Sequence, residues 1–144
     1  MDVLKVARIP PTVAAPNTTV FEAAAMMAEK GVGAVVVTDA DKRVLGIFTE
    51  RDTLLKVTAK RLDPDRTLLS QVMTSPVETA SADSTVDQAL ERMMNGHFRH
   101  LPIVDNDRRI IGIVSIRYLL MREIGAKQAS LDVLEAYLTA GGPG

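Results

Sequence analysis

Two seven-residue stretches of this sequence carry side chains suited to hydrogen-bond recognition. Residues 46–52 read GIFTERD and residues 112–118 read GIVSIRY. The first places the hydroxyl of Thr49 three positions before the carboxylate of Asp52, whereas the second ends in Tyr118. A carboxylate has two acceptor oxygens and suits two neighbouring hydroxyl donors. An acid at this place also suits the first turn of a helix, and a threonine suits a helix N-cap.

A basic pair stands in the second half of the chain. Arg99 and His100 directly precede the run LPIV, and Arg117 lies within the second heptad. Arginine presents a fixed fork of donors that fits phosphate oxygens. His97 and His100 are weak grounds for a metal, because a zinc site needs a third well-placed ligand and no HExxH pattern is present. We expect no metal site, and we expect no enzymatic activity, because no Ser-His-Asp pattern, P-loop or carboxylate pair stands out.

The chain is an internal duplication with an offset of 66 residues, in which residues 19–56 align with residues 85–122 without a gap. Pro10 matches Pro76 in the same frame, and a short extended piece is expected after each. Self-similarity at a fixed offset through several elements identifies a repeat. The identical pairs include Thr19/Thr85, Val20/Val86, Ala23/Ala89, Met27/Met93, Asp39/Asp105, Asp41/Asp107, Arg43/Arg109, Gly46/Gly112, Ile47/Ile113, Arg51/Arg117 and Leu54/Leu120.

Each copy predicts the order helix–strand–strand–helix. Thr19 followed by Glu22, and Thr85 followed by Gln88, match a capping box that begins a helix. The runs AVVV and LPIV predict a buried strand, the polar stretches DADKR and DNDRR a turn, and VLGIFT and IIGIVS a second strand. A second helix is expected at ERDTLLKV and at IRYLLMREI, a short helix at LLSQVM, and a last one at LDVLEAYL.

The bulk composition excludes several classes of protein. The 144 residues carry a net charge of −1 and 3% aromatic residues, so we expect no nucleic-acid partner. No cysteine is present, which excludes disulfides and thiolate metal sites. Neither a secretory signal nor an apolar run of about 18 residues is seen, so we expect no membrane partner and a soluble, cytoplasmic protein.

We expect an α/β (α+β) fold of two repeats related by a pseudo-two-fold axis, each a small β-sheet packed against two helices. Neither repeat buries much core alone, so the two should pack together. The expected division is residues 1–60 for the first repeat with its N-terminal lead-in, 61–72 for a linker, 73–128 for the second repeat, and 129–144 for a C-terminal helix and frayed tail.

The stretch VMTSPVETASADSTVDQALERMMNGHFRHLPIVDNDRRIIGIVS resembles a CBS domain (a cystathionine-β-synthase-type module). The earlier stretch PNTTVFEAAAMMAEKGVGAVVVTDADKRVLGIFTERD is similar. The resemblance implies a stand-alone tandem pair, a Bateman module, whose two clefts bind adenine-containing ligands.

The resemblance also implies a set of site residues. In such families the pattern Gly-h-x-Thr/Ser-x-x-Asp supplies a hydroxyl and a carboxylate that grips both ribose hydroxyls. The facing repeat lays its lead-in strand along the adenine. It meets the phosphates with a basic pair, here Arg99 and His100, which Arg117 would assist. The nucleotide-binding residues implied are Ile47, Thr49, Asp52, Val77, Glu78, Arg99, His100 and Arg117.

The second cleft lacks two of these features. It has Tyr118 where an aspartate is required, and Gly33 and Ala34 where the first repeat would supply its basic pair. The sequence therefore predicts one competent nucleotide site per chain. The second cleft is expected to be empty, filled by Tyr118, or tuned to a ligand without a triphosphate.

These features imply a non-catalytic regulatory module for signal transduction that binds AMP, ADP or ATP and requires no cofactor. S-adenosylmethionine and NAD are alternative ligands. CBS pairs commonly dimerise through their helices, so a homodimer and an effector protein of unknown identity are the expected partners. The alternative function is a ligand-free dimerisation and docking scaffold.

Overall fold

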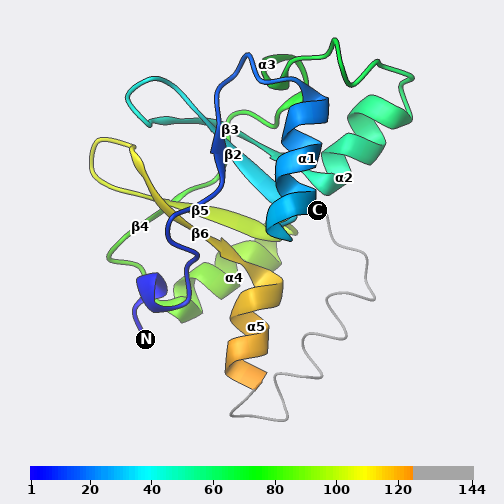
Figure 1. Cartoon of the computed structure of the whole chain (residues 1–144). Coiled ribbons are helices and arrows are strands. Elements are labelled where there is room, and N and C mark those ends of the chain that lie inside the picture. The colour runs from blue at the N-terminus through cyan, green and yellow to red at the C-terminus, as the bar shows by residue number, and fades with distance from the viewer. Residues whose placement is uncertain (125–144) are drawn as a thin grey trace.

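The computed structural model describes residues 1–124 and consists of two similar halves, one above the other (Figure 1). The upper half is built from β1 (Val13–Ala14), α1 (Val20–Lys30), β2 (Ala34–Thr38), β3 (Val44–Thr49) and α2 (Glu50–Asp52), which continues as the π-helical turn η2 (Thr53–Thr58). The lower half is built from β4 (Ala80–Ser81), α4 (Val86–Gly96), β5 (His100–Val104), β6 (Ile110–Ser115) and α5 (Ile116–Ile124). The predicted fold class and element order are confirmed. The helix predicted at LDVLEAYL lies outside the described residues.

Each half contains a three-stranded mixed sheet. In the first sheet β1 is parallel to β2, and β2 is antiparallel to β3; the second sheet repeats this with β4, β5 and β6. The register shifts between Val37 and Thr38 in one sheet and between Ile103 and Val104 in the other, which are matching positions. The duplication is therefore kept in strand pairing as well as in sequence.

The two long helices begin at the predicted capping boxes. Thr19 N donates to Glu22 Oε1 at 3.0 Å, and Glu22 N donates to Thr19 Oγ1 at 3.1 Å. The Thr85 and Gln88 pair repeats the arrangement at 2.9 Å and 3.1 Å. The bond from the Thr19 backbone holds the pKa of Glu22 below its ordinary value. The capping boxes thus fix where α1 and α4 begin.

The two helices also end alike. Gly31 ends α1 in the left-handed conformation, with φ of 64°, and His97 ends α4 with φ of 57°. Glycine is the usual residue at such a helix end. His97 therefore occupies a structural position at the end of a helix.

The lead-in segments cross between the halves. The turn η1 (Val3–Lys5) places Val3 and Val6 in the core of the second repeat, while the predicted short helix α3 (Leu69–Val72) places Leu69 and Val72 in the core of the first. These pairs match at the 66-residue offset. Each lead-in segment therefore completes the core of the other repeat.

The central strands β2 and β5 are buried on both faces. In β2, Val35 and Val37 pack in the core of the first repeat, whereas Ala34 and Val36 pack against Val104 and Ile113 of the second. Alternate side chains of a strand point to opposite faces. This arrangement explains the uninterrupted apolar run AVVV, because a strand covered on both sides has no solvent face.

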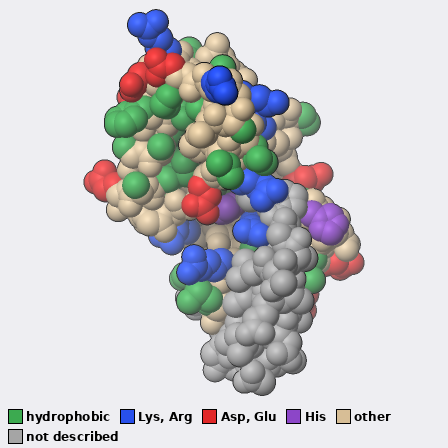
Figure 2. Space-filling view, turned by 90° about the vertical axis from the view of Figure 1, so that its right-hand side faces the viewer, with side chains coloured by type: hydrophobic (Ala, Val, Ile, Leu, Met, Phe, Trp, Pro, Cys, Tyr) green, Lys and Arg blue, Asp and Glu red, His purple; other side chains and the backbone are tan. Residues whose placement is uncertain are grey.

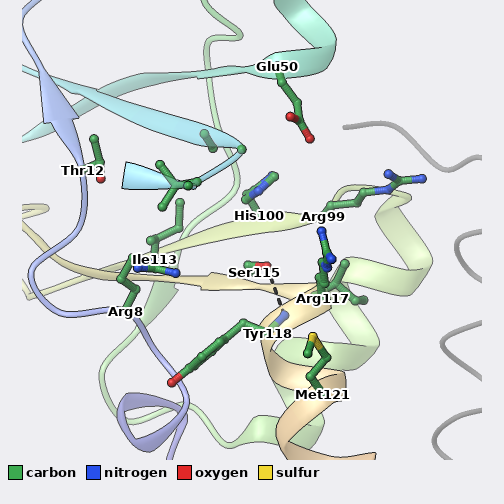
Figure 3. A pocket seen from close by; sticks show the side chains of 15 residues that line it. Arg8, Thr12, Glu50, Arg99, His100, Ile113, Ser115, Arg117, Tyr118 and Met121 are labelled. Carbon is green, nitrogen blue, oxygen red and sulfur yellow. Dashed lines mark hydrogen bonds between the residues drawn. The ribbon is translucent and has the colours of Figure 1, made fainter. Parts of the chain in front are cut away.

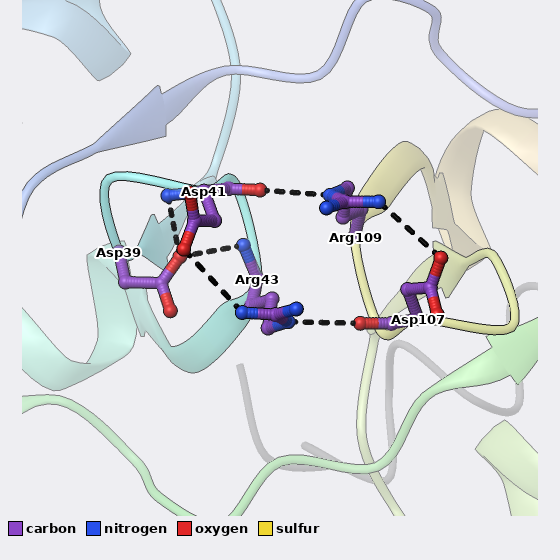
Figure 4. Close-up of polar contacts among 5 residues, drawn as sticks. All are labelled: Asp39, Asp41, Arg43, Asp107 and Arg109. Carbon is purple, nitrogen blue, oxygen red and sulfur yellow. Dashed lines mark hydrogen bonds and ion pairs between the residues drawn. The ribbon is translucent and has the colours of Figure 1, made fainter.

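The hairpin tips of the two sheets also join. Val44 N donates to Arg108 O at 3.1 Å, and Ile110 N donates to Lys42 O at 2.9 Å. The side chains of Arg43 and Arg109 cross reciprocally to backbone carbonyls of the opposite turn (Figure 4). The two repeats are thus held together at their tips by a symmetric set of bonds.

Candidate functional site

Two clefts form where the crossing segments meet the third strand of each sheet, β3 or β6. Thr74 and Ile47 exchange backbone hydrogen bonds at 2.8 Å and 3.0 Å, and Arg8 and Ile113 do the same at 2.8 Å and 3.2 Å. A Cβ on Gly46 would lie 2.7 Å from Thr74 O. The glycine of the first heptad is thus required by the close approach of the crossing segment.

The first cleft, which we call the Asp52 cleft, has a cavity of about 280 Å³. It contains six of the eight predicted site residues. The lining residues are Ile47, Thr49, Arg51, Asp52, Leu55, Thr74, Pro76, Val77, Glu78, Phe98 and His100. Strand β3 and the helix after it supply one wall, and the segment before β4 supplies the other. The cleft therefore combines both repeats, as expected.

The carboxylate of Asp52 is held in place by its own helix. Asp52 Oδ2 accepts from Thr49 N at 3.0 Å, and Asp52 N donates to Thr49 Oγ1 at 3.1 Å. Lys56 Nζ lies 3.5 Å from Oδ1, and the Asp52 side chain is 14% exposed. Thr49 is thus the helix N-cap and Asp52 a first-turn acid. A carboxylate accepts up to about four hydrogen bonds, so these contacts leave capacity for a ligand.

The opposite wall is also ordered by polar contacts. Arg92 donates to the carboxylate of Glu78 and to the backbone carbonyl of Thr79. Phe98 and Leu55 add apolar surface that the sequence reading did not identify. Phe98 follows the end of α4 within the motif HFRH, so its proximity to His100 was the available signal.

The second cleft, which we call the Tyr118 cleft, is the larger, with a cavity of about 530 Å³. Figure 3 shows Glu50, His100 and Arg117 directed toward one region, with the Tyr118 ring lying away from them. Arg8 Cζ is 6.0 Å from the centre of that ring. Tyr118 therefore lines this cleft and does not fill it. Arg8, Thr12 and Glu50 are lining residues that the sequence reading missed.

Two predicted residues lie in the other cleft from the one expected. Arg99 and Arg117 line the Tyr118 cleft, while His100 lines both. Adjacent residues of an extended chain point in opposite directions, so His100 can reach the Asp52 cleft while Arg99 does not. Arg117 lies in the first turn of α5, so it lines the cleft of its own heptad, as Arg51 does at the matching place in the first.

The two clefts differ in charge at matching positions. The Asp52 cleft is lined by Arg51 against the carboxylates of Asp52 and Glu78. The Tyr118 cleft is lined by three arginines against one carboxylate, Glu50. The pairs that line both clefts at the 66-residue offset are Ile47/Ile113, Thr49/Ser115, Arg51/Arg117, Asp52/Tyr118, Leu55/Met121, Thr74/Arg8, Glu78/Thr12, Phe98/Val32 and His100/Ala34.

The described residues, 1–124, contain neither a metal cluster nor a membrane-spanning helix. Within them, no group of three or more His, Cys, Asp or Glu side chains is placed to hold a metal ion. No helix in that part of the chain is both long and apolar enough to cross a membrane.

Comparison with known proteins identifies close structural relatives. A CBS-domain protein from Burkholderia ambifaria MC40-6, described as a signal-transduction protein, is 32% identical, with a TM-score of 0.79 over 89% of this chain and 97% of that one. The protein PAE2072 from Pyrobaculum aerophilum, solved with AMP, is 28% identical, with a TM-score of 0.77 over 94% and 99%. The domain pair of protein MJ0100, solved with 5′-methylthioadenosine and S-adenosylmethionine, is 27% identical, with a TM-score of 0.80 over 88% and 98%.

The chain matches only part of the length of several curated proteins. The protein MK0525 of Methanopyrus kandleri is 36% identical over 119 residues, which are 83% of this chain and 61% of that protein. The chain spans between 15% and 62% of the length of four curated relatives.

The CBS domain family matches this chain twice, at residues 3–58 and 69–125, which together exceed half of its length. The chain therefore belongs to the CBS domain family, as a tandem pair of CBS repeats.

Proposed function

We propose that this CBS pair is a non-catalytic regulatory module that binds an adenosine derivative in the Asp52 cleft, with one ribose-binding site per chain. The observation that carries the proposal is the pair of Thr49 and Asp52 in a cleft built from both repeats. The AMP complex and the S-adenosylmethionine complex of two structural relatives support the ligand class.

The ribose would bind at Asp52. Oδ2 already accepts from Thr49 N, and Oδ1 lies near Lys56, so the carboxylate is fixed before a ligand arrives. A carboxylate held in this way accepts from two vicinal hydroxyls without reorganising. The adenine would then lie between Ile47 and Val77, which stand on opposite walls of the cleft.

The charge of the cleft indicates which adenosine derivatives fit best. The carboxylates of Asp52 and Glu78 repel phosphates. Lys56 pairs with Asp52 and Arg92 pairs with Glu78, and Arg51 adds one positive charge. AMP should therefore bind more tightly than ADP or ATP, because each added phosphate increases the repulsion. S-adenosylmethionine and 5′-methylthioadenosine are favoured alternatives, and NAD is a weaker one.

The regulatory mechanism would be linkage between ligand and repeat arrangement. Ile47 and Asp52 belong to the first repeat, whereas Val77 and His100 belong to the second. A ligand that contacts both stabilises the arrangement in which the two walls are at binding distance. A partner that recognises this arrangement would bind more tightly to the liganded form, and the reverse would hold equally.

The partners would be a second copy of the chain and an effector protein. Hydrophobic side chains gather on the upper half of the face in Figure 2. Phe21 on α1, with Leu54 and Leu55 on η2, is among the large exposed hydrophobic residues of that repeat. Such a surface fits homodimerisation through the helices. The cytoplasm is the proposed location of the protein. A scaffold that dimerises without any ligand is the competing function.

The test is calorimetric titration of AMP, ADP, ATP, NAD, S-adenosylmethionine and 5′-methylthioadenosine into the wild type and Asp52→Asn. Asparagine can still accept a hydrogen bond from Thr49 N but loses the charge, so binding should weaken by about 1.5–3 kcal/mol, or roughly ten- to a hundredfold. Asp87→Asn changes an exposed first-turn acid of α4 and serves as the matched control. The 2′-deoxy form of the best ligand should lose a similar amount on the wild type.

Two results would contradict the proposal. Equal affinity of the wild type and Asp52→Asn for a ligand that binds would place that ligand outside the Asp52 cleft. No binding by any of the six ligands would leave the dimerising scaffold as the function.

A further inference from the structure

The Tyr118 cleft has the volume of a ligand site without the carboxylate of an adenosine site. Its cavity of about 530 Å³ lies within the range of about 300–1,000 Å³ typical of small-molecule pockets. At the position of Asp52 it has a neutral tyrosine, and at the position of Glu78 it has Thr12, which is buried. Both carboxylates of the first cleft are therefore replaced by uncharged side chains.

A cation has been added where the first cleft has none. Arg8 occupies the place of Thr74 and lies over the Tyr118 ring at 6.0 Å. An aspartate at position 118 would neutralise this arginine, whereas a tyrosine ring holds it by a cation–π contact and leaves its charge available. A tyrosine in place of the aspartate therefore removes diol recognition and holds the Arg8 cation beside position 118.

Among the described side chains, two of the three arginines form no ion pair with a carboxylate. Among residues 1–121, no ion pair involves Arg8 or Arg117. The acids of the Asp52 cleft differ, since Asp52 faces Lys56 and Glu78 faces Arg92. The Tyr118 cleft thus holds positive charge that a ligand can neutralise, and such charge-assisted hydrogen bonds are the stronger kind.

We propose that the Tyr118 cleft is a second ligand site of different chemistry, which binds a pyrophosphate group through Arg8 and Arg117 without recognising a ribose diol. The group can belong to an inorganic polyphosphate or to the phosphate chain of a nucleotide. His100 lines both clefts, so the two occupants would share one side chain. Glu50 is the carboxylate that faces this site, and its exposure lets it turn toward solvent.

The proposal does not require that the Asp52 cleft binds an adenosine derivative. Its test uses inorganic pyrophosphate and 2′,3′-dideoxy-ATP, titrated into the full chain by calorimetry, with 5′-methylthioadenosine as the phosphate-free comparison. Pyrophosphate should bind one per chain, and Arg8→Gln and Arg117→Gln should each weaken it about tenfold. Lys60→Gln, which removes one exposed positive charge outside both clefts, should leave the affinity unchanged. Raising the salt concentration should weaken pyrophosphate far more than 5′-methylthioadenosine.

The outcomes separate the two sites and the two ligand sources. Loss of pyrophosphate binding in the arginine variants but not in Asp52→Asn supports the proposal. Equal binding of pyrophosphate and dideoxy-ATP identifies free polyphosphate as sufficient, whereas tighter binding of dideoxy-ATP identifies a nucleotide source. No binding of either probe, or unchanged binding in both arginine variants with unchanged melting temperature, overturns it. Failure of the adenosine site would appear separately, as 5′-methylthioadenosine binding that is absent or insensitive to Asp52→Asn.

Discussion

The Asp52 and Tyr118 clefts occupy equivalent places in two repeats that share backbone, register and caps, yet their charges are opposite. The positions that remain alike, such as Gly46 and Gly112, are those where backbone from the other repeat approaches closely. The positions that differ, Asp52 against Tyr118 and Glu78 against Thr12, face the cavities. Packing thus preserves the duplicated scaffold, while a few exchanges at the cavity walls give the two clefts different charges.

The largest expected change in this comparison comes from Tyr118→Asp. The new carboxylate would meet Ser115, whose Oγ already accepts from the backbone N of residue 118 at 3.3 Å, and could complete a capping box like that of Thr49 and Asp52. It would also pair with Arg8. We expect 5′-methylthioadenosine binding to rise from one to two per chain, and pyrophosphate binding to weaken at least about tenfold.

The measurement is calorimetric stoichiometry on the wild type, Tyr118→Asp and Tyr118→Phe. The phenylalanine variant keeps the ring beneath Arg8 and should retain wild-type pyrophosphate affinity. If Tyr118→Asp gained no second site and lost no pyrophosphate affinity, residue 118 would not determine the chemistry of the cleft.

A smaller effect is expected where the repeats remain identical. Arg43 Nε donates to Asp107 O at 3.2 Å, and Arg109 Nε donates to Asp41 O at 3.3 Å (Figure 4). Each guanidinium also pairs with an aspartate of its own turn, but these pairs are exposed and add little. Arg43→Ala and Arg109→Ala should each lower the free energy of unfolding by about 1 kcal/mol.

Urea denaturation of both single variants and of the double variant measures this. Because the two bonds are equivalent, the single losses should agree within about 0.5 kcal/mol. A loss confined to one arginine would show that the pseudo-symmetry does not extend to the energetics of the tips.

The smallest effect distinguishes the two capping boxes. Glu22 caps α1 as an acid, whereas Gln88 caps α4 as an amide that does not titrate. The folded pKa of Glu22 lies below its ordinary value, because of the bond from the Thr19 backbone. Its contribution is therefore complete above the unfolded pKa and is lost as the pH falls through the lowered folded pKa.

Melting temperatures of the wild type and Glu22→Gln between pH 7 and pH 3 test this direction. The wild type should lose slightly more stability on acidification than Glu22→Gln does. An identical decrease of the melting temperature on acidification in the two proteins would contradict a stabilising role for the charged form of Glu22.

Much of the fold could be predicted from the sequence, because its signals are local. The capping residues Thr19 and Thr85 fix helix starts, and the apolar runs fix buried strands. The exchange of Val3 and Leu69 between the two cores was not predicted, because periodicity shows which residues are buried and not which partner buries them. The same limit applied to Arg99, whose direction depends on strand alternation at the start of β5.

Of the candidate site, the heptad comparison identified Thr49, Asp52 and the divergence at Tyr118. It did not identify Arg8, because this residue reaches the Tyr118 cleft through the crossing lead-in segment. The 66-residue offset held the signal, since Arg8 matches Thr74 beside the first cleft. A pseudo-symmetric site is therefore best predicted by pairing the lead-in residues as well as the motifs.

The most direct test of two clefts with different chemistry is a crystal structure of the full chain grown with both 5′-methylthioadenosine and pyrophosphate. The account predicts the nucleoside with its two ribose hydroxyls on Asp52, and pyrophosphate in contact with Arg8 and Arg117. Nucleoside in both clefts, or pyrophosphate beside Asp52 and Glu78, would contradict it.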